Sequence, residues 1–313
     1  MTDPSDSPLA SNSTVTYFHE PAVRKVLRYE SLIPAMELAL ADFSSGEVVH
    51  PVRGILPVGS NHGFFGIMPA VYGGIFGAKL VTLFPKNAGT ALPTHQGIIA
   101  IFSSATGEPI AMMDGRLITE MRTAAVSAVA VKWLAKNDAR VLAILGSGVQ
   151  ARAHYQALSV VRQFSEICVW SRNSSNAHTL AREIGGHATS AEQAVRDADI
   201  VITVTHSPEP VLRGKWLKPG ALVCAVGAVG LKNRELDNDA MQGAVIVDSR
   251  EAAKVESGDI FLAGATIYAE LGEIVAGKVP KPEANTTVFE SLGLAVEDLA
   301  SAKLVFEANA VTM

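Results

Sequence analysis

Three basic side chains in the first half of this 313-residue chain stand among apolar or small neighbours: Arg53, Lys79 and Arg122. A guanidinium binds a carboxylate or phosphate through two parallel hydrogen bonds, and an ammonium binds either group as a compact positive charge. The three residues together therefore favour an acidic substrate. For Arg53 and Lys79, the alternative is that each long side chain extends from a strand to reach water.

Arg122 supports the sharpest of these interpretations. Thr119 is a plausible helix N-cap, which would place Arg122 in the first helical turn, where a positive charge opposes the helix dipole. A substrate carboxylate or a cofactor phosphate beside the same helix end would relieve that repulsion. The alternative is an internal salt bridge from Arg122 to Glu120 or Asp114.

A glycine turn at 146–151 carries the pattern of a dinucleotide-binding site. It follows an apolar, strand-like run at 139–145 and opens a helical stretch that extends to about residue 163. Gly146 permits the tight turn, Gly148 lets the backbone approach a pyrophosphate, and Ala151 keeps the helix close to the sheet. A second strand-like run at 166–171 follows one helix later. We therefore predict a dinucleotide cofactor rather than an ordinary structural turn.

The residues at the end of this second strand are expected to determine which of the two nicotinamide cofactors binds. An acidic residue there would bind a ribose 2′-hydroxyl and repel a 2′-phosphate, but the sequence has none. It has a guanidinium flanked by hydroxyl and amide groups: Ser171, Arg172, Asn173 and Asn176. NADPH is therefore favoured over NADH. The alternative is that Arg172 is solvated and the polar run only caps the next helix.

A parallel sheet is needed to bring these residues together, and the sequence predicts one. Residues 129–286 alternate strand-like with helix-like runs, and the later strands are expected at 200–205, 221–226 and 244–248. This alternation predicts an α/β fold with a Rossmann-type, doubly wound parallel sheet. Ligands of such sheets lie beyond the carboxyl ends of the strands, so Thr205 and Val226 should face the cofactor.

The preceding part of the chain has another pattern. A helix near residues 31–43 is followed by short strands, which is typical of an α+β domain. We therefore expect two domains. Residues 1–128 with 287–313 would form a substrate-binding and dimerisation domain, and residues 129–286 would form the NADP-binding Rossmann domain.

Composition excludes several classes of protein. A net charge of −5 without Lys/Arg clusters argues against nucleic-acid binding, and the chain has no apolar run of 18 residues that could span a membrane. We expect a cytoplasmic protein whose residues 1–14 form a loose tail. Cys168 and Cys224 lie in expected strands and outside any Cys/His sequence motif, so they are interpreted as small buried apolar residues. No metal site is predicted.

Many motifs in order, from about residue 31 to the C-terminus, resemble the ornithine cyclodeaminase/mu-crystallin family. They are Lys79-Leu-Val-Thr82, Thr94-His-Gln96, Met113-Asp-Gly115, Arg122-Thr-Ala-Ala-Val-Ser-Ala128, Gly146-Ser-Gly-Val-Gln-Ala151, Asp199-Ile-Val-Ile-Thr-Val-Thr205, Glu256-Ser-Gly-Asp259, Ala269-Glu-Leu-Gly-Glu273 and Ser291-Leu-Gly293. The resemblance implies a homodimer that reduces or oxidises small imino and amino acids with NAD(P)(H). It also implies a final helix, about 291–309, that packs back on the substrate domain.

The resemblance also assigns residues by position. Substrate or effector contacts would come from Arg53, Lys79, Arg122 and Glu256, with Lys79, His95 and Arg122 as the catalytic candidates. Either His95 or Lys79 would donate the proton, or His95 would be a structural residue beside the cofactor. The cofactor would be lined by Thr94, His95, Arg122, Gly146, Gly148, Val149, Gln150, Ala151, Ser171, Arg172, Asn173, Asn176, Thr205, Val226 and Ser291.

One departure from the family pattern narrows the expected reaction. Cyclodeaminases carry an aspartate just after the glycine pair at a strand end, where this chain has Val229, which cannot transfer a proton. We therefore expect NADPH-dependent reduction of cyclic ketimine carboxylates, Δ1-piperideine-2-carboxylate or Δ1-pyrroline-2-carboxylate, to cyclic L-amino acids. The alternatives are an amino-acid or opine-type dehydrogenase, and a non-catalytic NADPH-dependent binding protein for a small molecule of the thyroid-hormone kind, a role known in one branch of the family.

Overall fold

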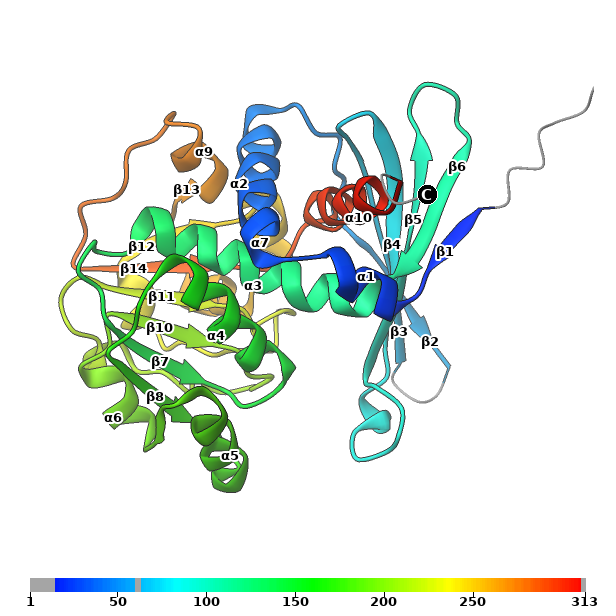
Figure 1. The fold of residues 1–313 in the computed structure, drawn as a ribbon. Coiled ribbons are helices and arrows are strands. Elements are labelled where there is room, and N and C mark those ends of the chain that lie inside the picture. Colours follow the sequence, from blue (N-terminus) through cyan, green and yellow to red (C-terminus); the bar gives the residue numbers. More distant parts are fainter. Residues whose placement is uncertain (1–14, 60–62, 311–313) are drawn as a thin grey trace, which may run out of the picture.

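Two sheets joined by a long helix make up the described part of the chain. The computed structural model describes residues 15–59 and 63–310 (Figure 1). The expected tail at 1–14 lies outside these residues. One sheet has eight strands and the other has six. The α/β class is confirmed.

The eight-stranded sheet is parallel throughout, as the alternation of strands and helices predicts. Its strand order is β13-β12-β14-β11-β10-β7-β8-β9. The strands are β7 (Val141–Leu145), β8 (Glu166–Trp170), β9 (His187–Ala188), β10 (Ile200–Thr203), β11 (Ala221–Ala225), β12 (Ala244–Val247), β13 (Ile267–Glu270) and β14 (Thr286–Glu290).

Helices cover both faces of this sheet, because successive residues of each central strand point into opposite cores. Leu142, Ile144 and Ile202 belong to one core, and Ala143 and Val201 belong to the other. The first core contains residues of α3 (Gly115–Leu134), α4 (Val149–Val161), α5 (Ser174–Ile184) and α9 (Leu271–Val275). The second contains residues of α6 (Ala191–Arg196), α7 (Arg250–Glu256) and α8 (Gly258–Ala263), with 3-10 turns at Gly214–Trp216 and Ala240–Gln242 nearby.

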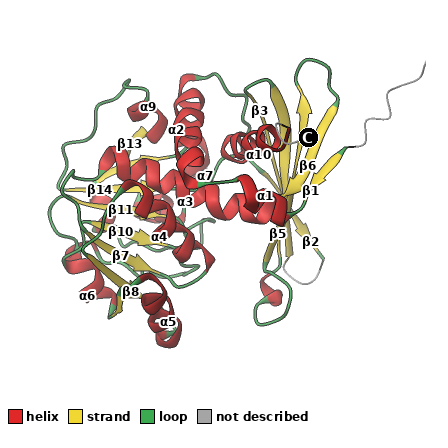
Figure 2. Cartoon of the chain, in the orientation of Figure 1, coloured by secondary structure: helices red, strands yellow, loops and turns green. Residues whose placement is uncertain are grey.

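The six-stranded sheet has the order β1-β6-β5-β4-β3-β2 and is antiparallel except where β1 pairs with β6. Helices cover one of its faces, and no helix of the described chain covers the other (Figure 2). Its strands are β1 (Thr16–Phe18), β2 (Gly54–Val58), β3 (Gly63–Tyr72), β4 (Ile75–Leu83), β5 (His95–Ser103) and β6 (Pro109–Asp114); α1 (Glu20–Val26), α2 (Tyr29–Ser45) and a 3-10 turn at Pro85–Asn87 complete this part.

Helix α3 starts at the six-stranded sheet and runs across one face of the eight-stranded sheet (Figure 1). Its N-cap is Asp114, whose Oδ1 accepts hydrogen bonds from the backbone N–H groups of Arg116 (2.9 Å) and Leu117 (3.5 Å). The expectation that Thr119 is the N-cap is therefore wrong. Arg122 lies one turn further into the helix than expected, so its charge does not oppose the N-terminal end of the dipole.

The last part of the chain adds a strand to the eight-stranded sheet and a helix that packs on the six-stranded sheet. Strand β14 pairs with β11 and β12, so residues 287–290 belong to the eight-stranded sheet rather than to the expected substrate domain. The chain then returns as α10 (Ala295–Ala310), which packs on β3, β4 and β5, as expected for the final helix. No helix among the described residues is long and apolar enough to cross a membrane.

Candidate active site

A cavity of about 560 Å³ lies where the two sheets face each other. One wall consists of β5 and the first two turns of α3, including Thr94, His95 and Arg122. The opposite wall consists of the turn before α4 and the segments that follow β10, β11 and β14. Of the residues expected at a cofactor or substrate, those on the cavity wall are Thr94, His95, Arg122, Gly148, Val149, Gln150, Val226 and Ser291.

The glycine turn fits a dinucleotide. Gly146 has φ +137°, and a Cβ there would lie 2.8 Å from the Val204 carbonyl oxygen, so only glycine suits this position. Gly148 is the N-cap of α4, and a Cβ there would meet nothing within 4 Å, which leaves its backbone open on the cavity side. The N–H groups of the first helical turn can therefore bind an anionic phosphate.

Two buried polar atoms at the cavity wall also lack partners. Gln150 Oε1 and Ser291 Oγ make no hydrogen bond with any described residue. Buried polar atoms are normally satisfied, so these two are available to a bound molecule with polar groups of its own. Together with the open backbone at Gly148, they fit a nicotinamide dinucleotide.

The end of β8 lies beside the glycine turn. Ser147 Oγ donates a hydrogen bond to Ser171 Oγ at 2.8 Å, which joins the turn to the end of the strand. Arg172 is exposed and makes no hydrogen bond or ion pair with the described part of the chain. Asn173 is the N-cap of α5 and accepts from the Asn176 N–H at 3.3 Å, so part of this polar run does cap the helix.

One buried carboxylate holds two of the strand ends together. Glu235 accepts hydrogen bonds from Thr203 Oγ1, from the backbone N–H and Oγ1 of Thr205, and from the backbone N–H of Gly227, at 2.5–2.8 Å. Thr205 therefore faces Glu235, whereas Val226 lines the cavity. The carboxylate fixes the segments after β10 and β11, which form one wall of the cavity.

Four buried charged side chains lie at or behind the cavity wall that β5 and α3 form. Arg122 Nη1 lies 2.7 Å from Glu297 Oε2, and its Nε lies 3.2 Å from Asp298 Oδ1. Asp298 Oδ2 also lies 2.7 Å from Lys79 Nζ. The internal salt bridge of Arg122 is therefore present, but with these two acids of α10 rather than with Glu120 or Asp114. Gly293 gives the guanidinium its space, since a Cβ there would lie 2.5 Å from Nη1.

Two charged side chains form hydrogen bonds with the backbone of the loop between β14 and α10. Asp248 Oδ2 accepts from the backbone N–H groups of Leu292 and Gly293, each at 2.6 Å. Arg53 donates to the carbonyl oxygens of the same two residues, at 2.8 and 2.6 Å, and forms an ion pair with Glu256 at 2.9 Å. Arg53 and Glu256 thus position the loop that carries the cavity residue Gly293.

Burial alters the protonation of several of these groups. It lowers the pKa of Lys79 to about 8 and raises the pKa of Glu297 to about 7, because each charged form loses its hydration. Burial also lowers the pKa of His95, and the nearby His206 lowers it further. The Nδ1 atom of His95 lies 3.1 Å from Thr94 Oγ1.

Of the three cations expected at a substrate, only Arg122 lines the cavity. Lys79 is 2% exposed, and a contact with substrate would require its ammonium to leave Asp298. Sequence reasoning did not single out Glu297, Asp298, Glu235 or Asp248. A signal was present for the first two, because Glu297 and Asp298 interrupt the apolar run that begins the last helix, where isolated acids are costly unless they are paired.

The parallel sheet, its glycine turn and the adjoining cavity define the class: a nicotinamide-dependent oxidoreductase with a Rossmann-type sheet. Within that class, the chain belongs to the ornithine cyclodeaminase/mu-crystallin family, whose family model matches residues 16–312. The ketimine reductase mu-crystallin of Mus musculus is 47% identical over 295 residues, which cover 91% of this chain and 94% of that protein.

Two solved structures share the whole fold. The Δ1-pyrroline-2-carboxylate reductase of Thermococcus litoralis, in complex with NADH and L-proline, has a TM-score of 0.90 and 34% identity, covering 95% of this chain and 98% of that one. An archaeal alanine dehydrogenase dimer with bound NAD has a TM-score of 0.91 and 29% identity, covering 96% and 97%. The expected family and Rossmann-type fold are confirmed, and the chain is an NAD(P)H-dependent oxidoreductase.

Proposed function

We propose that this protein reduces cyclic ketimine carboxylates, Δ1-piperideine-2-carboxylate or Δ1-pyrroline-2-carboxylate, to cyclic L-amino acids with NADPH. The observation that carries the proposal is the position of Arg122 on a cavity whose opposite wall is the glycine turn. A guanidinium there can hold a carboxylate while the rest of the substrate faces the cofactor. The similarity to a ketimine reductase and to a pyrroline-2-carboxylate reductase supports this substrate class.

The chain contributes binding and orientation. The α4 N-terminus and Gln150 would hold the pyrophosphate side of the cofactor, and Val226 and Ser291 would contact its nicotinamide half. When bound, the reduced nicotinamide supplies the hydride for the imine carbon. Arg122 would fix the carboxylate, and the apolar lining, which includes Val149, would exclude water from the reacting carbon.

A cyclic imine that is protonated before it binds needs no strong acid in the site. His95 lines the cavity and is the better placed of the two candidate donors. Lys79 lies behind Arg122, bound to Asp298, and acts in this proposal by holding Asp298 in place for Arg122. Arg53 and Glu256 act likewise through the loop that contains Gly293.

We further propose that NADPH is the preferred reductant and that the protein is a cytoplasmic homodimer. Arg172 is unpaired among the described residues and would bind the 2′-phosphate. The helix-free face of the six-stranded sheet is apolar, with Phe65, Leu80 and Ile98 half-buried on it and the rings of Phe76 and Phe102 stacked at 5.2 Å. A second copy of the chain would cover this face, as apolar faces of this kind are normally covered.

The experiment is to follow NADPH oxidation with three acceptor conditions: a preformed cyclic ketimine carboxylate, pyruvate plus an amine, and no acceptor. We expect oxidation only with the preformed ketimine. Faster turnover with pyruvate plus amine would indicate an opine-type or amino-acid dehydrogenase instead. NADPH binding without turnover in any condition would indicate a binding protein.

A further inference from the structure

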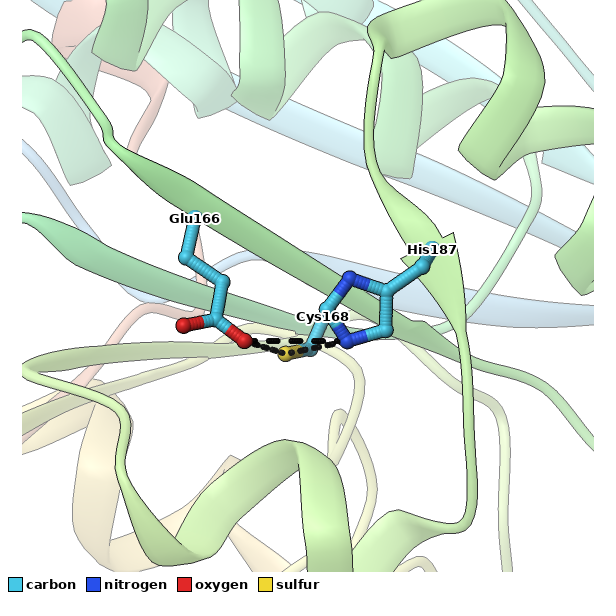
Figure 3. A group of neighbouring side chains, drawn as sticks. All are labelled: Glu166, Cys168 and His187. Carbon is cyan, nitrogen blue, oxygen red and sulfur yellow. Dashed lines mark hydrogen bonds and ion pairs between the residues drawn. The ribbon is translucent and has the colours of Figure 1, made fainter.

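Three side chains with metal-binding atoms meet at the edge of the eight-stranded sheet, outside the cavity. Cys168 of β8 pairs in register with His187 of the edge strand β9, and Glu166 lies two residues earlier on the same face of β8. All three point toward one another (Figure 3). Cys168 lies outside any Cys/His motif of the sequence, but strand pairing brings it beside a histidine 19 positions away.

The separations between the three atoms match those around a tetrahedral ion. Cys168 Sγ lies 3.4 Å from His187 Nε2 and 3.7 Å from Glu166 Oε1, and the last two atoms lie 3.7 Å apart. Zinc bonds of about 2.0–2.3 Å at tetrahedral angles place such ligand atoms roughly 3.3–3.6 Å apart. We propose that Glu166, Cys168 and His187 bind a divalent zinc-like ion, with a fourth position left to water.

The local charge agrees with a cation and disfavours a free reactive thiol. Burial, together with the carboxylates of Glu166 and Asp197, raises the pKa of Cys168 to about 11. A reactive cysteine needs the opposite, a surrounding that stabilises the thiolate. A bound metal ion would supply the missing positive charge and take the sulfur as a thiolate.

The site is accessible and requires little rearrangement. The side chains of His187 and Glu166 are 56% and 50% exposed, so an ion can enter from solvent and both can turn slightly toward it. Strand β9 has only two residues and is held to β8 by two register pairs. A metal shared between the strands would fasten this edge, so its effect should fall on stability rather than on the proposed reaction.

The test is zinc binding by the untagged full-length protein in competition with a chromophoric chelator, followed by cobalt substitution. We expect one zinc ion per chain, a rise in Tm on adding zinc, and a thiolate-to-cobalt charge-transfer band. Glu166→Gln and His187→Gln should weaken binding by at least about tenfold, since even indirect partners of a metal contribute that much. Cys168→Ser should remove the charge-transfer band. Turnover without zinc should be unchanged in the two exposed variants.

Two matched control variants test whether zinc binding depends on this cluster in particular. Cys224→Ala removes the other buried cysteine, and His178→Gln removes an exposed histidine of α5; both should bind zinc like the wild type. Absence of stoichiometric binding by the wild type would overturn the site. So would undiminished binding by His187→Gln, or equal losses in the His178 and His187 variants. These two histidines are exposed, so failure to fold does not complicate that comparison.

Discussion

Arg122 and Glu297 form a buried ion pair, with Nη1 and Oε2 2.7 Å apart, directly behind the cavity. The pair joins the long helix α3 to the C-terminal helix α10. Because the guanidinium also lines the cavity, a bound substrate carboxylate would compete with Glu297 for it. This relationship makes Arg122 both a structural residue and a candidate substrate ligand, and variants can separate the two roles.

Arg122→Met should be destabilised by about 3–5 kcal/mol, because Glu297 would stay buried without its guanidinium, while Asp298 would keep only Lys79. The double variant Arg122→Met/Glu297→Gln should recover much of that stability, since it removes the uncompensated charge as well. Both variants should lose about 10²-fold or more in kcat/KM for a ketimine carboxylate through lost orientation. Denaturant unfolding and steady-state kinetics measure the two effects. Recovery of both stability and turnover in the double variant would show that Arg122 is purely structural.

Glu297 should make substrate binding depend on pH near neutrality. Burial raises its pKa to about 7, and the nearby carboxylates of Asp248 and Asp298 add to the rise while Arg122 opposes it. Below that pH, Glu297 is neutral and leaves Arg122 free for a substrate carboxylate; above it, the ionised Glu297 competes. KM for the ketimine should therefore rise through about pH 7 in the wild type relative to Glu297→Gln. The ratio of the two KM values cancels the titration of the substrate itself, and a ratio independent of pH would contradict the role.

The sequence predicted the parallel sheet and its glycine turn well, because those signals are local. The strands around Gly146 and the helix after Gly148 lie where the periodicity places them. The start of α3 was missed because Thr119 was taken as the N-cap, although an aspartate before an apolar helical repeat, here Asp114, is also an N-cap signal.

The interior of the site was harder to predict, because it depends on contacts between distant segments. Lys79 meets Asp298 across 219 positions of sequence, and no local pattern joins them. The Cys168–His187 pair depends on a two-residue edge strand that is too short for periodicity to reveal. In both cases the sequence contains the charged or metal-binding residues but does not show which of them lie side by side.

Arg172→Ala should raise the KM for NADPH far more than that for NADH. Loss of a charge-assisted phosphate contact costs about 1.5–3 kcal/mol, which is roughly ten- to hundredfold. Steady-state kinetics with each cofactor measures the two constants. Arg182→Ala, which removes an exposed arginine from the last turn of α5, is the matched control and should change neither. Equal effects of Arg172→Ala on the two cofactors would rule out a 2′-phosphate contact.

Ornithine should not be converted to proline. Val229 lies on the cavity wall where an acid would have to handle the amine and water, and it cannot exchange a proton. Incubation of the protein with ornithine and catalytic NAD+ should release neither ammonia nor proline, as followed by a coupled ammonia assay and chromatography. Turnover comparable with ketimine reduction would mean that another side chain, such as Glu120 on the same cavity, replaces the missing acid.

The burial of His154 should lower the free energy of unfolding as the pH falls into the mildly acidic range. Its Nδ1 must donate to the Gln150 carbonyl oxygen at 2.7 Å, so its Nε2 accepts from Ser127 Oγ at 3.0 Å and the ring is neutral. Burial lowers its pKa from 6.5 to about 4. Between these values the unfolded chain binds the proton and the folded chain does not, so stability falls as pH falls, by about 3 kcal/mol in all. Urea unfolding from pH 7 to pH 4 should show this component in the wild type and in His178→Gln, but not in His154→Gln. The same pH dependence in all three proteins would mean that folding does not shift the pKa of His154.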